Sequence, residues 1–128
     1  MNKNNQKITI KTEKELQKFF NNETLKMKKN SRLVFYSDLK IDYNILFEGN
    51  VKLGKRNEIQ KDCMLKNIEI DNNNLIKFSS FIENTNIGNN NIVGPFAFIR
   101  NNTNIRNNCI IGAYVEIARS LICDETFI

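Results

Sequence analysis

The side chains that most often carry out chemistry are scarce in this 128-residue chain, which has no histidine and only three cysteines. Without histidine, the chain lacks the commonest general base and the commonest metal ligand. Cys63, Cys109 and Cys123 are odd in number and show neither a C-x-x-C motif nor a zinc-ligand spacing. We therefore expect reduced, mostly buried thiols, no metal site and no catalytic residue within this sequence.

Basic side chains could bind anionic ligands, because Lys and Arg outnumber Asp and Glu by 19 to 14 and give a net charge of +5. Small basic clusters lie at residues 26–29 and 52–56, and the rest are scattered. No recognition helix or aromatic RNA-binding platform accompanies them, so we do not expect nucleic acid as a partner. A solvated basic surface is one interpretation, and attraction to anionic sugar phosphates is the alternative.

The composition is that of an ordinary globular domain, with 41% hydrophobic and 26% charged residues. No run approaches the roughly 18 apolar residues that cross a bilayer. The first residues are polar and rich in Asn and Lys, unlike a secretion signal. The length allows one modest domain. We expect a cytoplasmic protein without a membrane partner.

Aliphatic residues recur every six positions along most of the chain, interrupted by three five-residue steps. Smaller residues, several of them Asn, recur two positions before the next aliphatic position. The aliphatic series is Phe35, Ile41, Phe47, Leu53, Ile59, Leu65, Ile70, Ile76, Ile82, Ile87, Val93, Ile99, Ile105, Ile111, Ile117, Ile122 and Ile128. The smaller series includes Val51, Cys63, Ser80, Ala97, Thr103, Cys109, Val115 and Thr126, with Asn57, Asn74 and Asn91 in the same place.

A period of six fits neither a lone amphipathic helix nor a simple alternating strand. It is typical of a triangular solenoid, in which each side is a short strand plus a turn and three sides make one coil. The sequence therefore predicts an all-β fold, a hexapeptide-repeat parallel β-helix of about five coils over residues 35–128. Large aliphatic residues point inward, small ones lie near the corners, and glycines such as Gly54 and Gly88 or the many Asn residues relax the turns.

A short N-terminal helix is predicted ahead of the solenoid. Thr12 and Glu15 have capping-box spacing, and Leu16, Phe19 and Phe20 form an apolar stripe. The helix is expected over residues 13–21, with an extension to 29 as the alternative, inside a capping segment of residues 1–34. It would cover the first coil. The repeat pattern continues through residues 122–128 as part of an unfinished coil, so we expect the β-helix to be truncated at its C-terminal end.

Three segments, taken in their order along the chain, resemble a known protein family. They are Ile41–Asn44 with Phe47–Gly54, then Gly94–Arg100, then Gly112–Glu116. Together they resemble the acetyltransferase half of the bifunctional N-acetylglucosamine-1-phosphate uridyltransferase and glucosamine-1-phosphate acetyltransferase family. The resemblance implies that the β-helix is left-handed, against the usual crossover rule. It also implies a homotrimer or another form of self-association.

The resemblance further implies a chemistry, namely transfer of an acetyl group from acetyl-CoA to the amine of glucosamine-1-phosphate. This step serves UDP-N-acetylglucosamine synthesis for peptidoglycan and lipopolysaccharide. Arg100 matches the family's phosphate-binding arginine. It follows Ile99, so its guanidinium should point outward, where it can bind phosphate oxygens with two bonds. Arg119 is a second candidate for contact with a sugar-1-phosphate or UDP-sugar.

The chain also departs from the family. Ala118 stands where the family has a substrate lysine, Asn101 replaces a proline and Phe98 replaces another arginine. The segment with the family's catalytic histidine, tyrosine and asparagine, the acetyl-CoA coils and the uridyltransferase domain have no counterpart in these residues. We therefore expect no acetyl-CoA binding by this chain alone.

Two hypotheses follow from these observations. In the first, the chain is a remnant or split piece of the acetyltransferase domain and is inactive alone. In the second, it is a non-catalytic hexapeptide-repeat module for binding or assembly.

Overall fold

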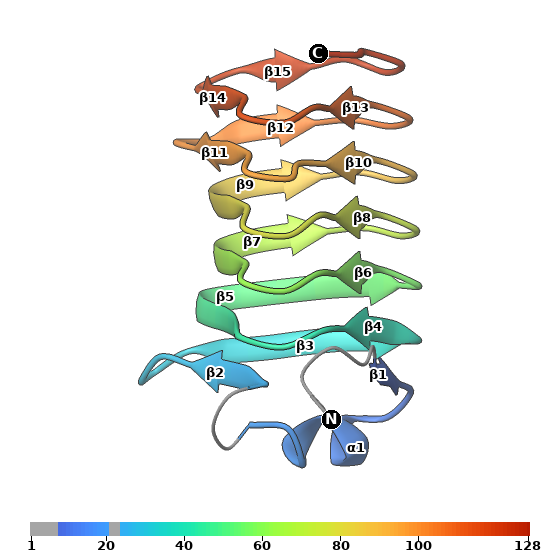
Figure 1. The fold of residues 1–128 in the computed structure, drawn as a ribbon, viewed down its shortest axis with the longest axis vertical. Coiled ribbons are helices and arrows are strands. Elements are labelled where there is room, and N and C mark those ends of the chain that lie inside the picture. The colour runs from blue at the N-terminus through green and yellow to red at the C-terminus, as the bar shows by residue number, and fades with distance from the viewer. Residues whose placement is uncertain (1–7, 21–23) are drawn as a thin grey trace.

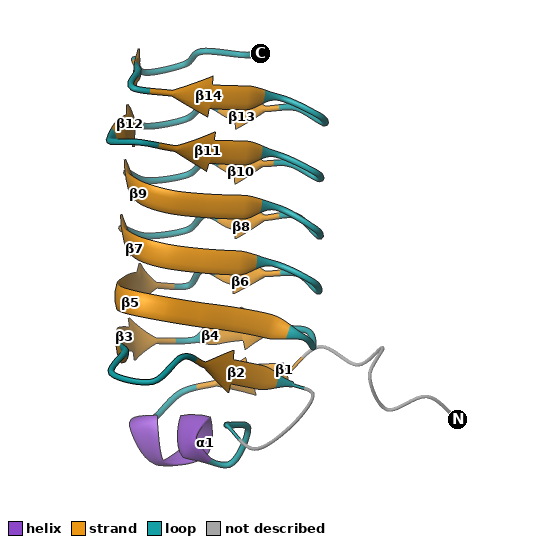
Figure 2. Cartoon of the chain, turned by 90° about the vertical axis from the view of Figure 1, so that its left-hand side faces the viewer, coloured by secondary structure: helices purple, strands orange, loops and turns teal. Residues whose placement is uncertain are grey.

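The protein is seen here in a computed structural model that describes residues 8–20 and 24–128. Its strands wind around one axis as a three-sided parallel β-helix of about five coils, with α1 (Glu13–Gln17) beneath the first coil (Figure 1). Figures 1 and 2 together show that the chain rises in the left-handed sense. The predicted fold class is confirmed.

One side of the β-helix, face 1, is a six-stranded sheet. Its strands from β4 onward pair in parallel, whereas β1 pairs with β4 in the antiparallel direction. In spatial order the strands of face 1 are β1 (Ile8–Ile10), β4 (Leu39–Ile41), β6 (Glu58–Ile59), β8 (Leu75–Ile76), β10 (Ile92–Val93) and β13 (Ile110–Ile111).

The other two sides, face 2 and face 3, share a nine-stranded sheet because three long strands bend around the corner between them. These are β5 (Ile45–Lys55), β7 (Met64–Ile70) and β9 (Phe81–Ile87). Face 2 is completed by β2 (Leu25–Met27), β11 (Phe98–Arg100) and β14 (Glu116–Ala118). Face 3 is completed by β3 (Arg32–Ser37), β12 (Thr103–Ile105) and β15 (Leu121–Ile122).

The core is a set of stacked aliphatic columns along the axis. Every predicted aliphatic position from Ile41 to Ile117 is buried, so the inward orientation is confirmed over these coils. Burial of each such side chain contributes about 1.5–3 kcal/mol. Phe35 and Ile122 are only partly buried and Ile128 is half-exposed, because fewer side chains cover the first and last coils.

The smaller series fills the space beside these columns, and its three Asn residues form a buried ladder. Asn74 donates from Nδ2 to Oδ1 of Asn57 at 3.1 Å and to the carbonyl oxygen of Gly88 at 2.7 Å. Asn91 repeats the pattern one coil higher, and its Oδ1 accepts from the backbone N–H of Cys109 at 2.8 Å. The amides therefore satisfy backbone groups that the turns would otherwise leave unpaired in the interior.

The five-residue steps all fall at the corner between face 2 and face 3. Asn67 and Asn84 each occupy such a corner alone, with φ of 49° and 50°. At the six-residue corner between β11 and β12, both Asn101 and Asn102 have positive φ, 56° and 61°. Asn tolerates this conformation better than most residues, which accounts for its abundance at the turns.

The role of glycine after the aliphatic positions differs from the predicted one at Gly88, whereas Gly94 has the positive φ, 91°, of a relaxed turn. Gly88 does not have a positive φ, so it does not relax a turn. A Cβ on Gly88 would instead lie 2.6 Å from the carbonyl oxygen of Arg106 on the next coil. Close stacking of backbones is therefore the reason for glycine at this position.

The N-terminal helix is shorter than predicted. Thr12 caps it as expected, with its Oγ1 accepting from the backbone N–H of Glu15 at 3.2 Å. The helix ends at Gln17, and residue 21 lies outside the described residues. The alternative extension to residue 29 is wrong, because Leu25–Met27 is a strand that pairs with β5.

Candidate functional site

Arg100 is the last residue of β11, and its side chain projects from face 2 because its neighbour Ile99 points into the core with 0% exposure. Its Nη2 donates to Oε2 of Glu116 on the next coil at 2.7 Å, and its Nε lies 3.3 Å from the same oxygen. The predicted outward orientation is thus present, and the guanidinium has a carboxylate partner. A charge-assisted contact of this length orients the arginine strongly.

The guanidinium of Arg100 also lies over an aromatic ring. Its Cζ is 5.2 Å from the ring centroid of Phe98, and the Phe98 ring meets Phe81 edge to face at 6.5 Å. A cation over the face of a ring is attracted by the negative potential of the π system. Phe98, which replaces an arginine of the resembled family, therefore contacts Arg100 from the same strand and adds no second positive charge.

The structure separates the two predicted binding residues by their place in the coil. The register partner of Arg100 on β14 is Ala118, so the position of the family's lysine lies directly above Arg100 and holds a methyl group. Arg119 is exposed at the following corner with φ of 50°, and its backbone N–H donates to the carbonyl oxygen of Asn101 at 3.1 Å. Arg119 therefore belongs to a corner column, and Arg100 belongs to the sheet face.

Sequence reasoning did not find an aromatic column at the corner between face 1 and face 2. Phe96 packs edge to face on Phe78 at 5.4 Å and stacks on Tyr114 at 5.1 Å with nearly parallel rings. Tyr114 is 79% exposed. The signal was the recurrence of an aromatic residue at intervals of 18 in the sequence, one coil apart.

The cysteines confirm the expectation of free thiols, two of them buried. Burial raises the pKa of Cys63 from its ordinary value of 9.0 to about 12, because a thiolate cannot be solvated in the core. Its Sγ lies 3.3 Å from the carbonyl oxygen of Lys77. Cys123 is exposed near the end of the chain. Cys63 is therefore an unreactive residue that packs in the core, not a nucleophile.

Within residues 8–20 and 24–128, no group of three or more Cys, Asp or Glu side chains is arranged to hold a metal ion. Nor does any helix of this part of the chain have the length and apolar character that crossing a membrane requires.

Fold and surface together define a left-handed hexapeptide-repeat β-helix with an arginine-bearing outer face. The family model described as "GMPPB C-terminal domain" matches residues 30–128. The chain belongs to that family.

The resemblance inferred from the sequence is also confirmed by individual relatives. The bifunctional protein GlmU of Ruthia magnifica subsp. Calyptogena magnifica is 36% identical over 92 residues, which are 72% of this chain and 20% of that protein. GlmU of Acinetobacter baylyi is 35% identical over 85 residues, 66% of this chain and 19% of that protein. The chain thus spans about a fifth of the length of these curated relatives.

A solved structure also shows some likeness. It is the acetyltransferase domain of PglB from Neisseria gonorrhoeae FA1090 in complex with acetyl coenzyme A. The TM-score is 0.44 at 15% identity, over 74% of this chain and 48% of that one.

Proposed function

We propose that this β-helix is of the acetyltransferase type, and that its own residues bind a sugar-1-phosphate or UDP-sugar weakly at Arg100 without transferring an acetyl group. The similarity to GlmU supports the assignment to cytoplasmic UDP-N-acetylglucosamine synthesis. In this proposal, acetylation of glucosamine-1-phosphate requires coils and a base supplied by other residues or another chain. The division into a capping segment, 1–34, and a β-helix, 35–128, is part of the same proposal.

The observation that carries this proposal is the ion pair between Arg100 and Glu116. A phosphate must compete with the Glu116 carboxylate for the same guanidinium, so binding at this position is weak. The site also needs a base near the substrate amine, because a protonated amine cannot attack a thioester. Glu116 is the carboxylate that contacts Arg100, and its charge is already balanced there.

General-base catalysis typically contributes about 10² to 10⁴ in rate, and loss of a positioned thioester removes a further proximity contribution. The test is thiol release from acetyl-CoA in the presence of glucosamine-1-phosphate and the purified chain. We expect no turnover above background. Robust turnover by the 128-residue protein would overturn the proposal, because it would require a base elsewhere.

Binding is tested separately by NMR titration with glucosamine-1-phosphate and UDP-N-acetylglucosamine. We expect weak binding that falls with added salt, and Arg100→Ala should abolish it at the face 2 site. Arg106→Ala is the matched control, because Arg106 is an exposed arginine whose side chain lines a hollow on face 3. Equal binding by Arg100→Ala and wild type would remove Arg100 from the proposal.

An assembly role is the second candidate, and an apolar column on the outside of face 1 favours it. Leu75, Ile92 and Ile110 are in register on successive coils, and Phe127 bridges to Ile110. Ile110 is 41% and Phe127 71% exposed. An exposed apolar column of this kind is typical of a protein contact surface.

We propose that this column takes part in self-association, as a homotrimer or another oligomer. Light scattering at tens of micromolar should show a mass above that of the 14.9 kDa monomer. Ile110→Lys should lower that mass, whereas Asn104→Lys, at an exposed polar position of face 3, should not. A clean monomer for the wild-type protein would contradict the assembly role.

A further inference from the structure

Face 2 carries an outward apolar column with a charged residue at each end. Its strands, from β2 to β14, pair in parallel, and Figure 2 shows them stacked along the axis. The residues of this column are in register from coil to coil and are, in order, Lys26, Leu46, Met64, Phe81, Phe98 and Glu116. Phe81 and Phe98 are 48% and 39% exposed. Four apolar side chains therefore lie between a lysine at the N-terminal end of the face and a glutamate at the C-terminal end.

A second outward column of face 2, two residues further along each strand, alternates in charge. It consists of Glu48 on β5, Lys66 on β7, Glu83 on β9 and Arg100 on β11. Nζ of Lys66 lies 3.5 Å from Oε2 of Glu48, and these side chains are 36% and 33% exposed. This pair within the chain is open to solvent, so both charges can also contact a second molecule.

The apolar column is complementary to its own reverse. A two-fold axis along the strands, midway between β7 and β9, places β7 opposite β9 and β5 opposite β11 of a second copy. Met64 then faces Phe81 of the second copy, and Leu46 faces Phe98. Apolar side chains thus meet apolar side chains at each step, and the thioether of Met64 meets an aromatic ring, which is a favourable contact.

The charged column is complementary under the same axis. Lys66 faces Glu83 of the second copy, and Glu48 faces Arg100. Each of the four residues therefore meets the opposite charge. Moving the axis onto β7 would instead place Glu48 opposite Glu83, so repulsion between like charges disfavours that alignment.

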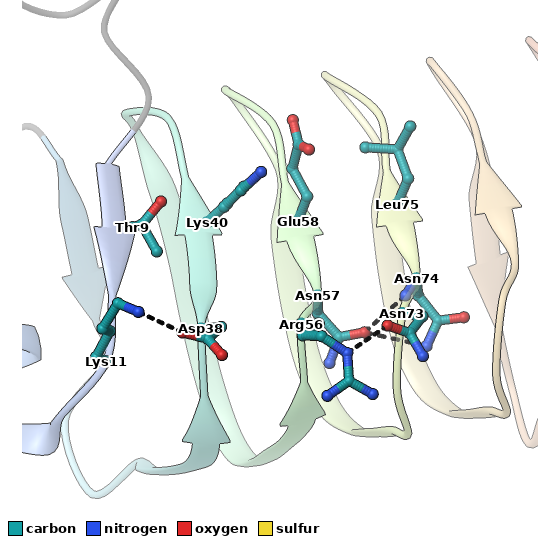
Figure 3. Close-up of a pocket in the computed structure, with 10 residues that line it drawn as sticks. All are labelled: Thr9, Lys11, Asp38, Lys40, Arg56, Asn57, Glu58, Asn73, Asn74 and Leu75. Carbon is teal, nitrogen blue, oxygen red and sulfur yellow. Dashed lines mark hydrogen bonds and ion pairs between the residues drawn. The ribbon is translucent and has the colours of Figure 1, made fainter.

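Face 1 lacks this property. Its outward column is, in order, Thr9, Lys40, Glu58, Leu75, Ile92 and Ile110. Figure 3 shows the first four of these on successive strands. Reversal of the column would place Lys40 against Ile92 and Glu58 against Leu75. Burial of a charged group against an apolar one is costly, so face 1 does not fit its own reverse.

Face 3 lacks the property for another reason. Reversal of its outward column would place Lys52 opposite Asn104 and Glu69 opposite Asn86. No pair of opposite charges forms at these positions, and the centre of the face would hold no apolar contact. Face 2 is therefore the side whose shape and charge suit a reversed copy.

We infer that face 2 binds a second copy of this chain in the reversed orientation, as a two-fold symmetric dimer with its axis between β7 and β9. The apolar column supplies the affinity, and the charge pairs fix the orientation and alignment. The contact is about 24 Å tall, from spacings of roughly 4.8 Å between strands, so the dimer is small and reversible. The inference goes beyond the proposed function, because it needs neither the apolar column of face 1 nor a ligand at Arg100.

The two ends of face 2 provide the test of orientation. Lys26 and Glu116 lie on β2 and β14, at opposite ends of the strand order, so a zero-length carbodiimide cannot join them within one chain. In the reversed dimer they face each other. At tens of micromolar protein and low salt, we expect a covalent dimer whose mass-spectrometric peptide map shows the Lys26–Glu116 link. Lys26→Arg keeps the charge but removes the reactive amine, so it should abolish the link and leave the dimer intact in sedimentation velocity.

Charge reversal tests the pairing near the axis. Lys66→Glu and Glu83→Lys should each raise the dimer dissociation constant at least tenfold, because like charges then face each other. An equimolar mixture of the two variants should regain the wild-type dimer, since every Glu then faces a Lys. Lys55→Glu makes the same change at an exposed position outside face 2 and should leave the dimer unaffected. Unequal folding of the variants is checked by thermal unfolding, and failure of the mixture of two folded variants to dimerise would overturn the inference.

The outcomes also separate this dimer from the assembly role of face 1. Ile110→Lys should leave the Lys26–Glu116 link in place. An oligomer that lacks this link would overturn the face 2 dimer and leave the face 1 role standing. A link that persists when Ile110→Lys has no effect on the mass would support the face 2 dimer and remove the face 1 role. A wild-type protein that stays monomeric at these concentrations would overturn the face 2 dimer.

Discussion

Arg100 and Glu116 lie on successive coils, with Nη2 of the guanidinium 2.7 Å from Oε2 of the carboxylate. The side chains are 34% and 57% exposed, so solvent screens much of their attraction. The pair nevertheless directs the arginine at a carboxylate rather than at a ligand. In the proposed function, this contact is the reason that phosphate binding at Arg100 is weak.

Glu116→Gln should strengthen phosphate binding at Arg100. The substitution removes the competing charge but keeps the size of the side chain. We expect a gain of about two- to fivefold, since an exposed ion pair is worth about 0–1 kcal/mol. NMR titration with glucosamine-1-phosphate measures it at signals near residue 100. Glu69→Gln on face 3 is the control, and an equal gain there would point to net charge alone.

Ile99→Asp should unfold the β-helix. Ile99 is fully buried between Ile82 and Ile117 in its column, and an unpaired carboxylate cannot be accommodated there. We expect a loss of about 4 kcal/mol or more in the free energy of unfolding. Asn104→Asp adds the same charge at an exposed position of β12 and should be nearly neutral. Chemical denaturation followed by circular dichroism compares the two, and a folded, stable Ile99→Asp protein would contradict the packing.

Asn74→Ala should destabilise the fold without changing its shape. The amide of Asn74 bonds Asn57 and Gly88, and its Oδ1 accepts from the backbone N–H of Asn91 at 2.9 Å. Each buried group left without a partner costs about 1–3 kcal/mol. Asn86→Ala, at an exposed position of face 3, should cost little. Urea denaturation should separate the two variants clearly, and similar midpoints would mean that the ladder contributes nothing.

Thiol labelling should distinguish the three cysteines. Cys123 is exposed and should react with a maleimide at neutral pH, whereas Cys63 and Cys109 are buried and should react only after unfolding. Intact mass spectrometry should show one rapid addition. Cys123→Ser should abolish that addition. Rapid double labelling of the native protein would contradict the burial.

The raised pKa of Cys63 makes stability depend on alkaline pH. The thiol ionises near 9.0 in the unfolded chain and near 12 in the folded one. Its contribution to stability is therefore complete below about pH 9 and is lost as the pH rises toward 12. The difference in unfolding free energy between wild type and Cys63→Ala should shrink over that interval. A pH-independent difference would contradict the burial of a neutral thiol.

The sequence by itself determined which residues face the axis. A period of six is typical of a triangular solenoid with one large inward side chain per strand, so the inward positions from Ile41 to Ile117 were predicted from spacing alone. Asn at the corners followed as well, because few other residues tolerate a positive φ. Arg100 could be placed outside because it follows Ile99. The hand of the coil came from the resemblance and not from the spacing.

Only the tertiary structure decided which side chains meet. Glu116 reaches Arg100, and Asn73 reaches Arg56, because 16 and 17 residues of chain return each partner one coil higher. Periodicity shows on which face of the β-helix each residue lies. Which side chains touch depends on the alignment of successive coils and on the side-chain rotamers, and that alignment changes wherever a corner is one residue shorter. The alternative extension of the helix to residue 29 fails for a similar reason, since Leu25–Met27 pairs with β5 and this pairing outweighs a local helical preference. Both arginines look alike in the sequence, and the neighbouring coil alone gives Arg100 a carboxylate partner and Arg56 an amide partner.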